Sequence, residues 1–386
     1  MIRPLDGYVV SPDAAERVVA PVAETLHQVE RDRILATNPD TSLFLLTEDA
    51  AARSHARDYL DRVTTDGTFQ PAAGWYVYRI TDEDHQQTGI VAEVAVSAYE
   101  SDRIRRHEHT VAEVAGHVAD TLDEVGGSTH PVSLIYRHDR AIDDIVAAAV
   151  TAEPTLRLTR EGRTQETWKV DGDPGLGAAL DAIRELYIAD GHHRSAGAAV
   201  LSHREAPGLA DIRSHFLAVL FPDTDMRTLS YHRFLRLPDH SPGEVLAAIA
   251  RHFPMQRLSA PDGVPEPGEV WLCAEGTWYA VQLPHGTEEG PTSALDAARL
   301  QYQILGPICD VADPRADPRL NYVPGNVPLH ALAETCLEQA SLGFVTHPPS
   351  VDDVMAVSDA GGIMPPKSTW FTPKIGAGIF LRRLDR

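Results

Sequence analysis

The chain contains very little lysine, and this deficit is part of a wider shortage of positive charge. Of its 386 residues, three are lysines (Lys169, Lys367 and Lys374), and 34 basic residues stand against 56 acidic ones, a formal charge of 34 − 56 = −22. A field of this sign repels nucleic-acid phosphates over most of the surface, so we expect no nucleic-acid partner. A local group of basic side chains can still bind a small anion.

Cysteine is scarce as well, and long apolar runs are missing. Cys273, Cys309 and Cys336 lie far apart and form no C-x-x-C pair, which indicates reduced thiols. The N-terminus lacks a basic segment followed by an apolar core, and no apolar run reaches membrane-spanning length. We therefore expect a cytoplasmic protein without membrane attachment, and the oligomeric state stays open.

Several common catalytic motifs are also missing from the sequence. There is no Walker loop, no G-x-G-x-x-G, no H-E-x-x-H and no G-x-S-x-G. Their absence argues against a P-loop nucleotide hydrolase, the usual dinucleotide fingerprint, a zinc protease of that type and a serine hydrolase elbow.

The pattern of apolar residues predicts an α/β or α+β fold, in which a mixed sheet carries flanking helices and an additional C-terminal subdomain follows. Predicted strands of this sheet are residues 75–80, 89–97, 131–136 and 186–189. Predicted helices include residues 11–36, 111–125 and 176–183. We divide the chain into a core domain over 1–210 and a C-terminal region over 211–386, whose terminal segment returns to the functional site.

The most informative stretch is Leu186–Ala199, which indicates a short apolar strand, a polar turn and a helix of small residues. The turn is Asp190-Gly191-His192-His193-Arg194. A helix N-terminus presents unpaired backbone N–H groups and partial positive charge, and Arg194 adds a forked donor. Gly191 permits a tight turn, while Asp190 and the histidines are candidate proton carriers or metal ligands. We predict an anion site here rather than an ordinary solvated turn.

Two further polar clusters are candidates for the same site. Residues 104–110 combine Arg105 and Arg106 with His107, Glu108 and His109, which suits anion binding and proton transfer but gives weak zinc spacing. Taken alone, this stretch also fits a charged cap before the next helix.

The other cluster, residues 364–374, holds two of the three lysines, and Lys367, Ser368 and Thr369 are its candidate phosphate ligands. A solvated terminal loop is the competing interpretation for this cluster. Trp370 and Phe371 favour a loop that is tied down.

These motifs, in this order, resemble the domain-of-unknown-function 1015 family over nearly the whole chain. The residues that carry the resemblance are 76–79, 105–110, 131–136, 187–194, 231–233 and 364–369. The family is similar to the ParB/sulfiredoxin-like superfamily, which includes free serine kinases.

The resemblance implies that Gly191, His192, His193 and Arg194 hold nucleotide phosphates. It also implies that an acidic residue from the N-terminal part acts on the substrate hydroxyl. The stretch that matches the N-terminal motif of the family is Ala20–Thr25. In this stretch the family's aromatic residue is lost, and Glu24 is the candidate acid.

The leading hypothesis is a phosphotransferase that uses ATP or ADP with Mg²⁺ and acts on a small hydroxy compound, with free serine or a related hydroxy amino acid implied by resemblance. Arg105, Arg106 and Lys367 are candidate phosphate clamps beside the turn. Glu108, Asp190 or Glu24 are candidates for the base, Glu108 and Asp190 for magnesium ligands, and His107 is a further catalytic candidate.

Two alternatives remain open. One is a nucleotide-binding switch or partner-binding protein without kinase activity. The other is a metal-dependent hydrolase with His107, His109, His192 and His193 as ligands. We predict that the three clusters converge on one pocket, because an acidic protein that binds phosphates must concentrate its positive donors.

Overall fold

The computed structural model describes residues 1–22, 26–47, 49–83, 85–259, 261–284 and 290–385. The chain forms two compact units. Unit 1 comprises residues 1–226 and 373–386, and unit 2 comprises residues 227–372. Among the described residues, no helix is long and apolar enough to span a membrane.

Unit 1 is built on a mixed sheet, so the predicted fold class of a mixed sheet with flanking helices is confirmed. Within the described ranges this sheet has nine strands in the order β6-β11-β8-β12-β5-β4-β10-β9, and β1 pairs with β5. The pairs β11–β6 and β12–β8 are parallel and the others are antiparallel. The strands are β1 (Ile2–Arg3), β4 (Tyr76–Asp82), β5 (His85–Ala95), β6 (Ile104–Arg105), β8 (Val132–Tyr136), β9 (Leu156–Arg160), β10 (Arg163–Lys169), β11 (Leu186–Asp190) and β12 (His215–Pro222).

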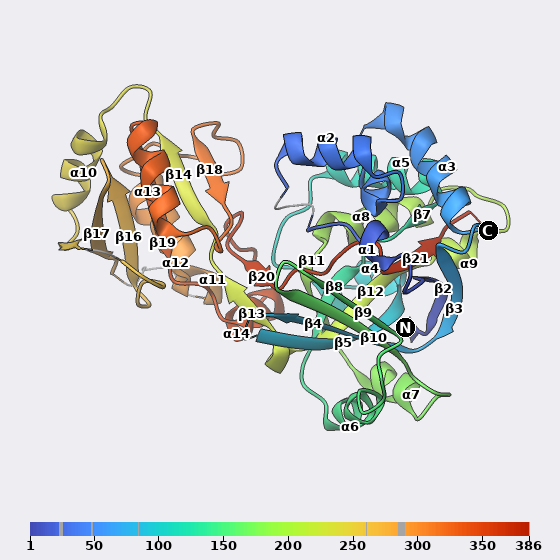
Figure 1. Ribbon diagram of the computed structural model, residues 1–386. Helices are drawn as coiled ribbons and strands as arrows, with labels where there is room; N and C mark the ends of the chain where they lie inside the picture. Colours follow the sequence, from blue (N-terminus) through green and yellow to red (C-terminus); the bar gives the residue numbers. More distant parts are fainter. Residues whose placement is uncertain (23–25, 48, 84, 260, 285–289, 386) are drawn as a thin grey trace. The chain divides into compact units, whose positions relative to one another are not determined.

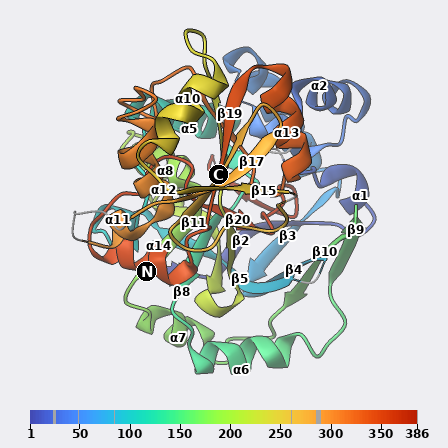
Figure 2. The same ribbon diagram turned by 90° about the vertical axis from the view of Figure 1, so that its left-hand side faces the viewer.

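Helices and a smaller sheet cover this sheet. The helices are α1 (Ala15–Val18), α2 (Gln28–Thr37), α3 (Arg53–Val63), α4 (Val96–Glu100), α5 (Ala112–Val125), α6 (Arg140–Ala149), α7 (Leu176–Ala182), α8 (His192–Ser202) and α9 (Ala210–Arg213). The neighbours α6 and α7 lie together at one side of the sheet, and α5 contacts both α3 and α8 (Figures 1 and 2). The smaller sheet has the order β3-β2-β21-β7, from strands β2 (Leu5–Val10), β3 (Phe69–Gly74), β7 (Gly127–Ser128) and β21 (Phe380–Arg383).

The two faces of the large sheet bury different partners because side chains alternate along each strand. Ile90, Ala92 and Val94 of β5 belong to a buried apolar cluster with Ile142 of α6 and Leu176 of α7. On β4, Val77 shares this cluster, whereas the neighbouring Tyr76 and Tyr78 stack edge-on against Phe380 of β21. The C-terminal strand therefore packs on the face opposite to α6 and α7.

The helix predicted over residues 11–36 is wrong as one continuous element. The structure has α1 and α2 instead, and Val19, the residue after α1, is already extended. Pro21 follows two residues later, and proline lacks the N–H that a helix interior requires and disfavours helical geometry before it. The helical pattern over residues 11–36 therefore belongs to two short helices, which the prediction joined across the break between them.

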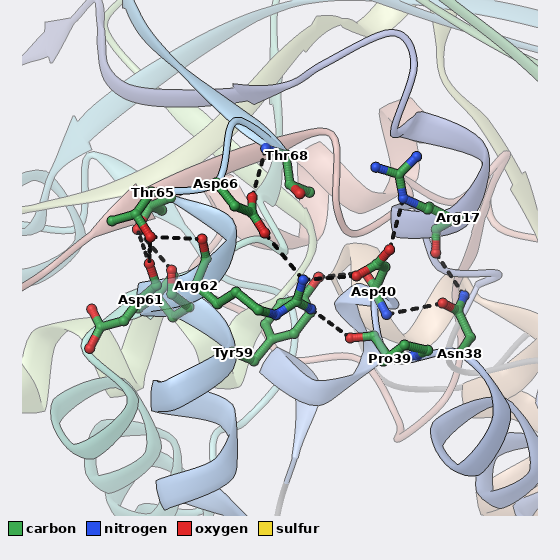
Figure 3. A network of polar contacts seen from close by, with 12 residues as sticks. Arg17, Asn38, Pro39, Asp40, Tyr59, Asp61, Arg62, Thr65, Asp66 and Thr68 are labelled. Carbon is green, nitrogen blue, oxygen red and sulfur yellow. Dashed lines mark hydrogen bonds and ion pairs between the residues drawn. The ribbon is translucent and has the colours of Figure 1, made fainter.

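A polar network holds the segment after α2 against its neighbours (Figure 3). The carboxylate of Asp40 accepts hydrogen bonds from Arg17 of α1 at 2.8 Å and from Arg62 of α3 at 2.9 Å. The Tyr59 hydroxyl donates to the backbone oxygen of Asp40 at 2.7 Å, and Asn38 donates to the backbone oxygen of Arg17 at 2.7 Å. These bonds join α1, α3 and the loop between them.

Unit 2 is a second layered body. Within its described residues, an antiparallel sheet has six strands in the order β15-β17-β16-β19-β14-β18, and β13 pairs separately with β20. One apolar cluster joins this sheet to α10 and α12, and a second one, which includes Leu332 and Cys336, joins it to α13. The elements are β13 (Arg227–Leu229), β14 (His232–Arg236), α10 (Pro242–Ala250), β15 (Met255–Leu258), β16 (Glu269–Ala274), β17 (Thr277–Gln282), α11 (Pro291–Ala294), α12 (Asp296–Leu300), β18 (Leu320–Val323), α13 (Leu329–Glu338), β19 (Ser341–Thr346), α14 (Val351–Asp359) and β20 (Trp370–Thr372).

Candidate functional site

The turn from β11 to α8 has the strand, glycine and helix that the sequence predicts. Asp190 is the last residue of β11, and a register shift between Ile188 and Asp190 against β8 breaks the ladder just before the turn. Gly191 has φ = +101°, and a Cβ there would lie 2.8 Å from Nε of Arg194. Only glycine therefore fits easily. α8 begins at His192 without a side-chain cap, so its first turn presents backbone N–H groups.

Asp190 is held between two cations. Lys374 Nζ donates to its Oδ1 at 2.6 Å, and Arg194, in the first turn of α8, donates to Oδ2. Burial opposes ionisation of this carboxyl, but Lys374 and Arg194 together outweigh burial and hold the pKa of Asp190 far below its ordinary value. Asp190 is therefore a carboxylate at every pH near neutrality, and both of its oxygens are engaged by positive groups.

His130, in the loop before β8, contacts the other side of the Arg194 guanidinium. Arg194 Nη1 lies 2.9 Å from Nε2 of His130. Burial, reinforced by the charge of Arg194, lowers the pKa of His130 to about 3. The imidazole is therefore neutral and can accept a hydrogen bond from Arg194, which orients the guanidinium without adding charge.

The loop between β6 and α5 brings the 104–110 cluster to the same turn. The rings of His107 and His192 meet edge to face with centroids 4.5 Å apart, and Glu108 Oε2 lies 4.0 Å from His192 Nδ1. The backbone N–H of Val111, just before α5, donates to His193 Nε2 at 3.2 Å. Two clusters that are more than 80 residues apart in sequence thus form one constellation.

The two buried histidines of this constellation are neutral. Burial lowers the pKa of His107 to about 4, and burial together with the neighbouring His107 ring lowers the pKa of His192 well below its ordinary value. Among the described residues, His192 Nε2 is a buried atom without a hydrogen-bond partner. An unmade hydrogen bond of this kind costs about 1–3 kcal/mol, which a bound ligand with a suitable donor or acceptor can offset.

Arg105 and Arg106 lie beside this constellation but are engaged by another acid. Asp102 Oδ2 is 3.1 Å from Arg105 Nη1, and its Oδ1 is 3.5 Å from Arg106 Nη2. Arg106 also lies over the ring of Tyr99, 5.1 Å from its centroid. Their predicted role as phosphate clamps stays a prediction.

The predicted ligands of the third cluster belong to unit 2. Lys367 Nζ lies 5.2 Å from the ring centroid of Tyr231, and Ser368 Oγ donates to the backbone oxygen of Pro365 at 2.7 Å. Thr369 is buried. These contacts are internal to unit 2, so a role for the three residues beside Arg194 stays a prediction. Glu24, the predicted N-terminal acid, lies outside the described residues.

The donor set does not fit a magnesium ion held by the protein. In the described part of the chain, no three His, Cys, Asp or Glu side chains are grouped so as to hold a metal. Of the two predicted ligands, Asp190 already gives one oxygen to Lys374 and the other to Arg194. A magnesium ion at Asp190 would lie beside both positive groups, which repel it. We therefore derive no step through a metal.

Two residues of this constellation were missed by the sequence prediction. Lys374 is one of three lysines and lies in the 364–374 cluster, yet Lys367 was selected from that cluster. His130 is a single histidine before a strand, and no local pattern distinguishes it. The rarity of lysine in an acidic chain was the usable signal for Lys374.

The fold and this constellation define a mixed α/β protein in which two positively charged side chains, Arg194 and Lys374, meet at the start of α8. Residues 2–298 match the model of the family described as "Protein of unknown function (DUF1015)", and the chain belongs to this family. This confirms the resemblance that the sequence motifs indicated. No curated protein matches the chain.

The similarity of the chain to solved structures is distant. A conserved hypothetical protein from Pyrococcus furiosus is 16% identical, with 76% of this chain and 96% of that chain covered and a TM-score of 0.41. A free serine kinase in complex with AMP is 13% identical, with 78% and 94% covered and a TM-score of 0.41. SbnI with a C-terminal truncation, from Staphylococcus aureus, is 14% identical, with 76% and 87% covered and a TM-score of 0.41.

Proposed function

We propose that unit 1 binds the phosphate groups of ATP or ADP at the β11–α8 turn and transfers a phosphoryl group to a small hydroxy compound. A hydroxy amino acid such as free serine is the acceptor that the family resemblance suggests. The observation that carries this proposal is the meeting of Arg194 and Lys374 at the uncapped first turn of α8. Phosphoryl transfer depends mainly on such positioned positive groups.

The charge of the whole protein strengthens this argument. A molecule with a formal charge of −22 repels nucleotides, so a phosphate site requires a local excess of donors. The start of α8 supplies backbone N–H groups, and Arg194 has a side chain that is 22% exposed. A ligand can therefore reach the guanidinium while its stem remains packed.

Glu108 is our candidate for the base that accepts the proton of the acceptor hydroxyl. Asp190 is a poor base, because its pKa is held far below the ordinary range and both oxygens bind cations. The Glu108 side chain is 29% exposed beside His192. In the proposed step the hydroxyl proton moves to Glu108, and the hydroxyl oxygen forms a bond to the terminal phosphorus. The bond from that phosphorus to the bridging oxygen breaks, and its electron pair leaves with the nucleotide.

A cavity in unit 1 offers room for the nucleoside. It has a volume of about 590 Å³ and is lined by residues of α2, α3 and the segment between them, including Leu43 and Phe44. The adjacent Ser42 donates to the backbone oxygen of Ala377 at 3.2 Å. Ala377 follows Lys374 by three residues, which span at most about 10 Å. The segment that carries Lys374 therefore contacts the segment that lines this cavity.

The decisive experiment combines binding and product detection with the full chain. ADP and ATP are titrated with Mg²⁺ by calorimetry, and the protein is incubated with each nucleotide and a panel of hydroxy amino acids. Mass spectrometry then detects a phosphorylated acceptor. Binding without any phosphorylated product would instead favour a nucleotide-binding protein that lacks kinase activity.

Arg194→Ala is the matched test of the phosphate site. We expect it to weaken nucleotide binding by roughly 1.5–3 kcal/mol, or about 10- to 150-fold, which is the range for a hydrogen bond to a charged group. The control is Arg204→Ala, because Arg204 follows the other end of α8 and also pairs with carboxylates, Asp120 and Asp123. Equal affinity of the Arg194 variant and the wild type would remove this phosphate site.

A further inference from the structure

The C-terminal segment over residues 373–378 is fastened on both sides of Lys374. Before it, Gln87 Nε2 donates to the backbone oxygen of Pro373 at 2.9 Å. After it, the backbone oxygen of Ala377 accepts from the N–H of Ala20 at 3.1 Å. The Lys374 side chain is itself 10% exposed. Its ammonium group is therefore positioned in advance rather than free to sample the surface, which lowers the entropy lost on binding a ligand.

Close packing at Gly378 holds the far end of this segment. Gly378 has φ = +102°, and a Cβ there would lie 2.5 Å from Ser42 Oγ and 3.0 Å from Val19 Cα. Its N–H donates to Thr129 Oγ1 at 2.9 Å, and Thr129 directly precedes His130. The segment thus passes beside the residue that orients Arg194. Its path links Asp190, the loop before β8 and the N-terminal stretch near Ala20.

We propose that Lys374 is a direct ligand of the phosphate anion and that Asp190 is the residue that positions Lys374 and Arg194 for it. This inference rests on the proposed function and assigns residues that the sequence prediction left out or placed in another role. Lys374 comes from the end of the chain, so the proposed site is completed by the C-terminal segment.

The geometry of Asp190 supports this assignment. Each carboxylate oxygen takes one positive group, so Lys374 and Arg194 meet at a single carboxylate. A phosphate group also presents several oxygens, and the two positive groups can bind one phosphate together. An ammonium has three N–H bonds and a guanidinium has five, so donors of both groups can serve Asp190 and a ligand at once.

Electrostatics explains why the positioning acid is needed. Two positive groups that lie this close repel each other, and burial strengthens the repulsion. Asp190 neutralises one charge and leaves the three groups with a net charge of +1 (+2 − 1). That excess attracts an anion, whereas the pair of cations alone would be costly to keep together in the unliganded protein.

The test is a double variant, Asp190→Asn with Lys374→Gln, assayed in the full chain. It removes both members of the pair and leaves Arg194, so the net charge of the three groups stays +1. Binding of inorganic pyrophosphate, and separately of ADP, is measured by calorimetry without magnesium. We expect both affinities to fall at least tenfold. The double variant Arg157→Gln with Glu166→Gln, which removes an ion pair of 2.8 Å on β9 and β10, is the control.

The possible results separate this inference from the proposed function. If the double variant binds pyrophosphate as the wild type does, while Arg194→Ala loses binding, Lys374 is not a ligand and the proposed function stands. If the wild type binds neither pyrophosphate nor nucleotide, both proposals fail. Lys374→Arg provides a folded comparison that retains the charge and the pair with Asp190. It should bind pyrophosphate more tightly than the double variant, and affinity as low as that of the double variant would also contradict the inference.

Discussion

Individual side chains at the β11–α8 turn divide into groups that stay charged and groups that stay neutral. Asp190 is ionised because Lys374 and Arg194 overcome the effect of burial on its pKa. His107 and His130 are neutral because burial lowers their pKa values to about 4 and about 3. The charge states of Asp190, His107 and His130 are therefore constant around neutral pH. The histidines contribute packing and hydrogen bonds. The three charged groups, Asp190, Lys374 and Arg194, determine the electrostatic potential of the site.

The buried His107 makes the stability of unit 1 depend on pH. Its pKa is about 4 in the folded protein against an ordinary value of 6.5, so between these values the unfolded chain binds a proton that the folded protein does not. The stability that the neutral His107 contributes is thus fully present above pH 6.5, and it is lost as the pH falls toward 4. The free energy of unfolding should decrease by about 2 kcal/mol between pH 7 and pH 5 from this residue.

His107→Gln removes this contribution and is the way to measure it. Urea-dependent hydrogen exchange of the amides of β11 and α8, at pH 7 and pH 5, reports the stability of this region. We expect the wild type to lose more stability than the variant over this range. An equal loss in both proteins would show that His107 is protonated in the folded state.

Secondary structure elements around the site follow local signals in the sequence to different degrees. β11, Gly191 and α8 were predicted because an apolar run, a turn residue and a run of small residues follow one another directly. α5 was predicted from its helical period and the glycine at its end, where Gly126 has φ = +80°. The helix over 11–36 failed, because periodicity alone did not weigh Pro21. The residues within and next to each of these elements determine its secondary structure, and a single proline is enough to divide a helix.

Phe44, in the segment between α2 and α3, provides a test at the level of elements. It lines the cavity of about 590 Å³ that we propose for the nucleoside. Phe44→Ala should weaken ADP binding about 5- to 150-fold, since stacking of a base on an aromatic ring contributes about 1–3 kcal/mol. Pyrophosphate has no base, so its affinity should be unchanged.

Val29→Ala on α2 is the control for this measurement, because Val29 is 82% exposed and does not line the cavity. Calorimetric titrations of the two variants with both ligands are compared. A Phe44 variant that loses ADP and pyrophosphate to the same extent would place the nucleoside elsewhere.

Contacts across the whole of unit 1 are what the sequence could not reveal. Asp190 and Lys374 are 184 residues apart, and no spacing rule joins two such positions. Glu93 is a further example, because β5 reads as a buried strand and yet carries a fully buried carboxylate. The pairing of Glu93 with Arg3 and Arg382, from the two ends of the chain, exists only after the sheets have assembled. Such partners follow from topology, which local pattern does not specify.

Glu93 joins both chain ends to the large sheet, and we expect its charge to be essential to unit 1. It accepts hydrogen bonds from Arg3 Nε at 3.0 Å and from the N–H of Asp6 at 3.0 Å, and it lies 2.9 Å from Arg382 Nε. Glu93→Gln would leave the Arg382 guanidinium, in a residue that is 2% exposed, without its counter-charge. Breaking a buried pair in this way costs about 3–5 kcal/mol.

The matched control for this change is Glu166→Gln, because its partner Arg157 has a side chain that is 59% exposed. Because the Arg157 guanidinium stays in contact with water when its partner is lost, this change should cost at most about 1 kcal/mol, although Glu166 itself is buried. Urea unfolding and limited proteolysis near β21 measure both variants. Arg382 lies eight residues after Lys374, so the Glu93 variant should also release the C-terminal segment and weaken pyrophosphate binding. Equal urea midpoints for the two variants would mean that the buried pair does not hold the chain ends in place.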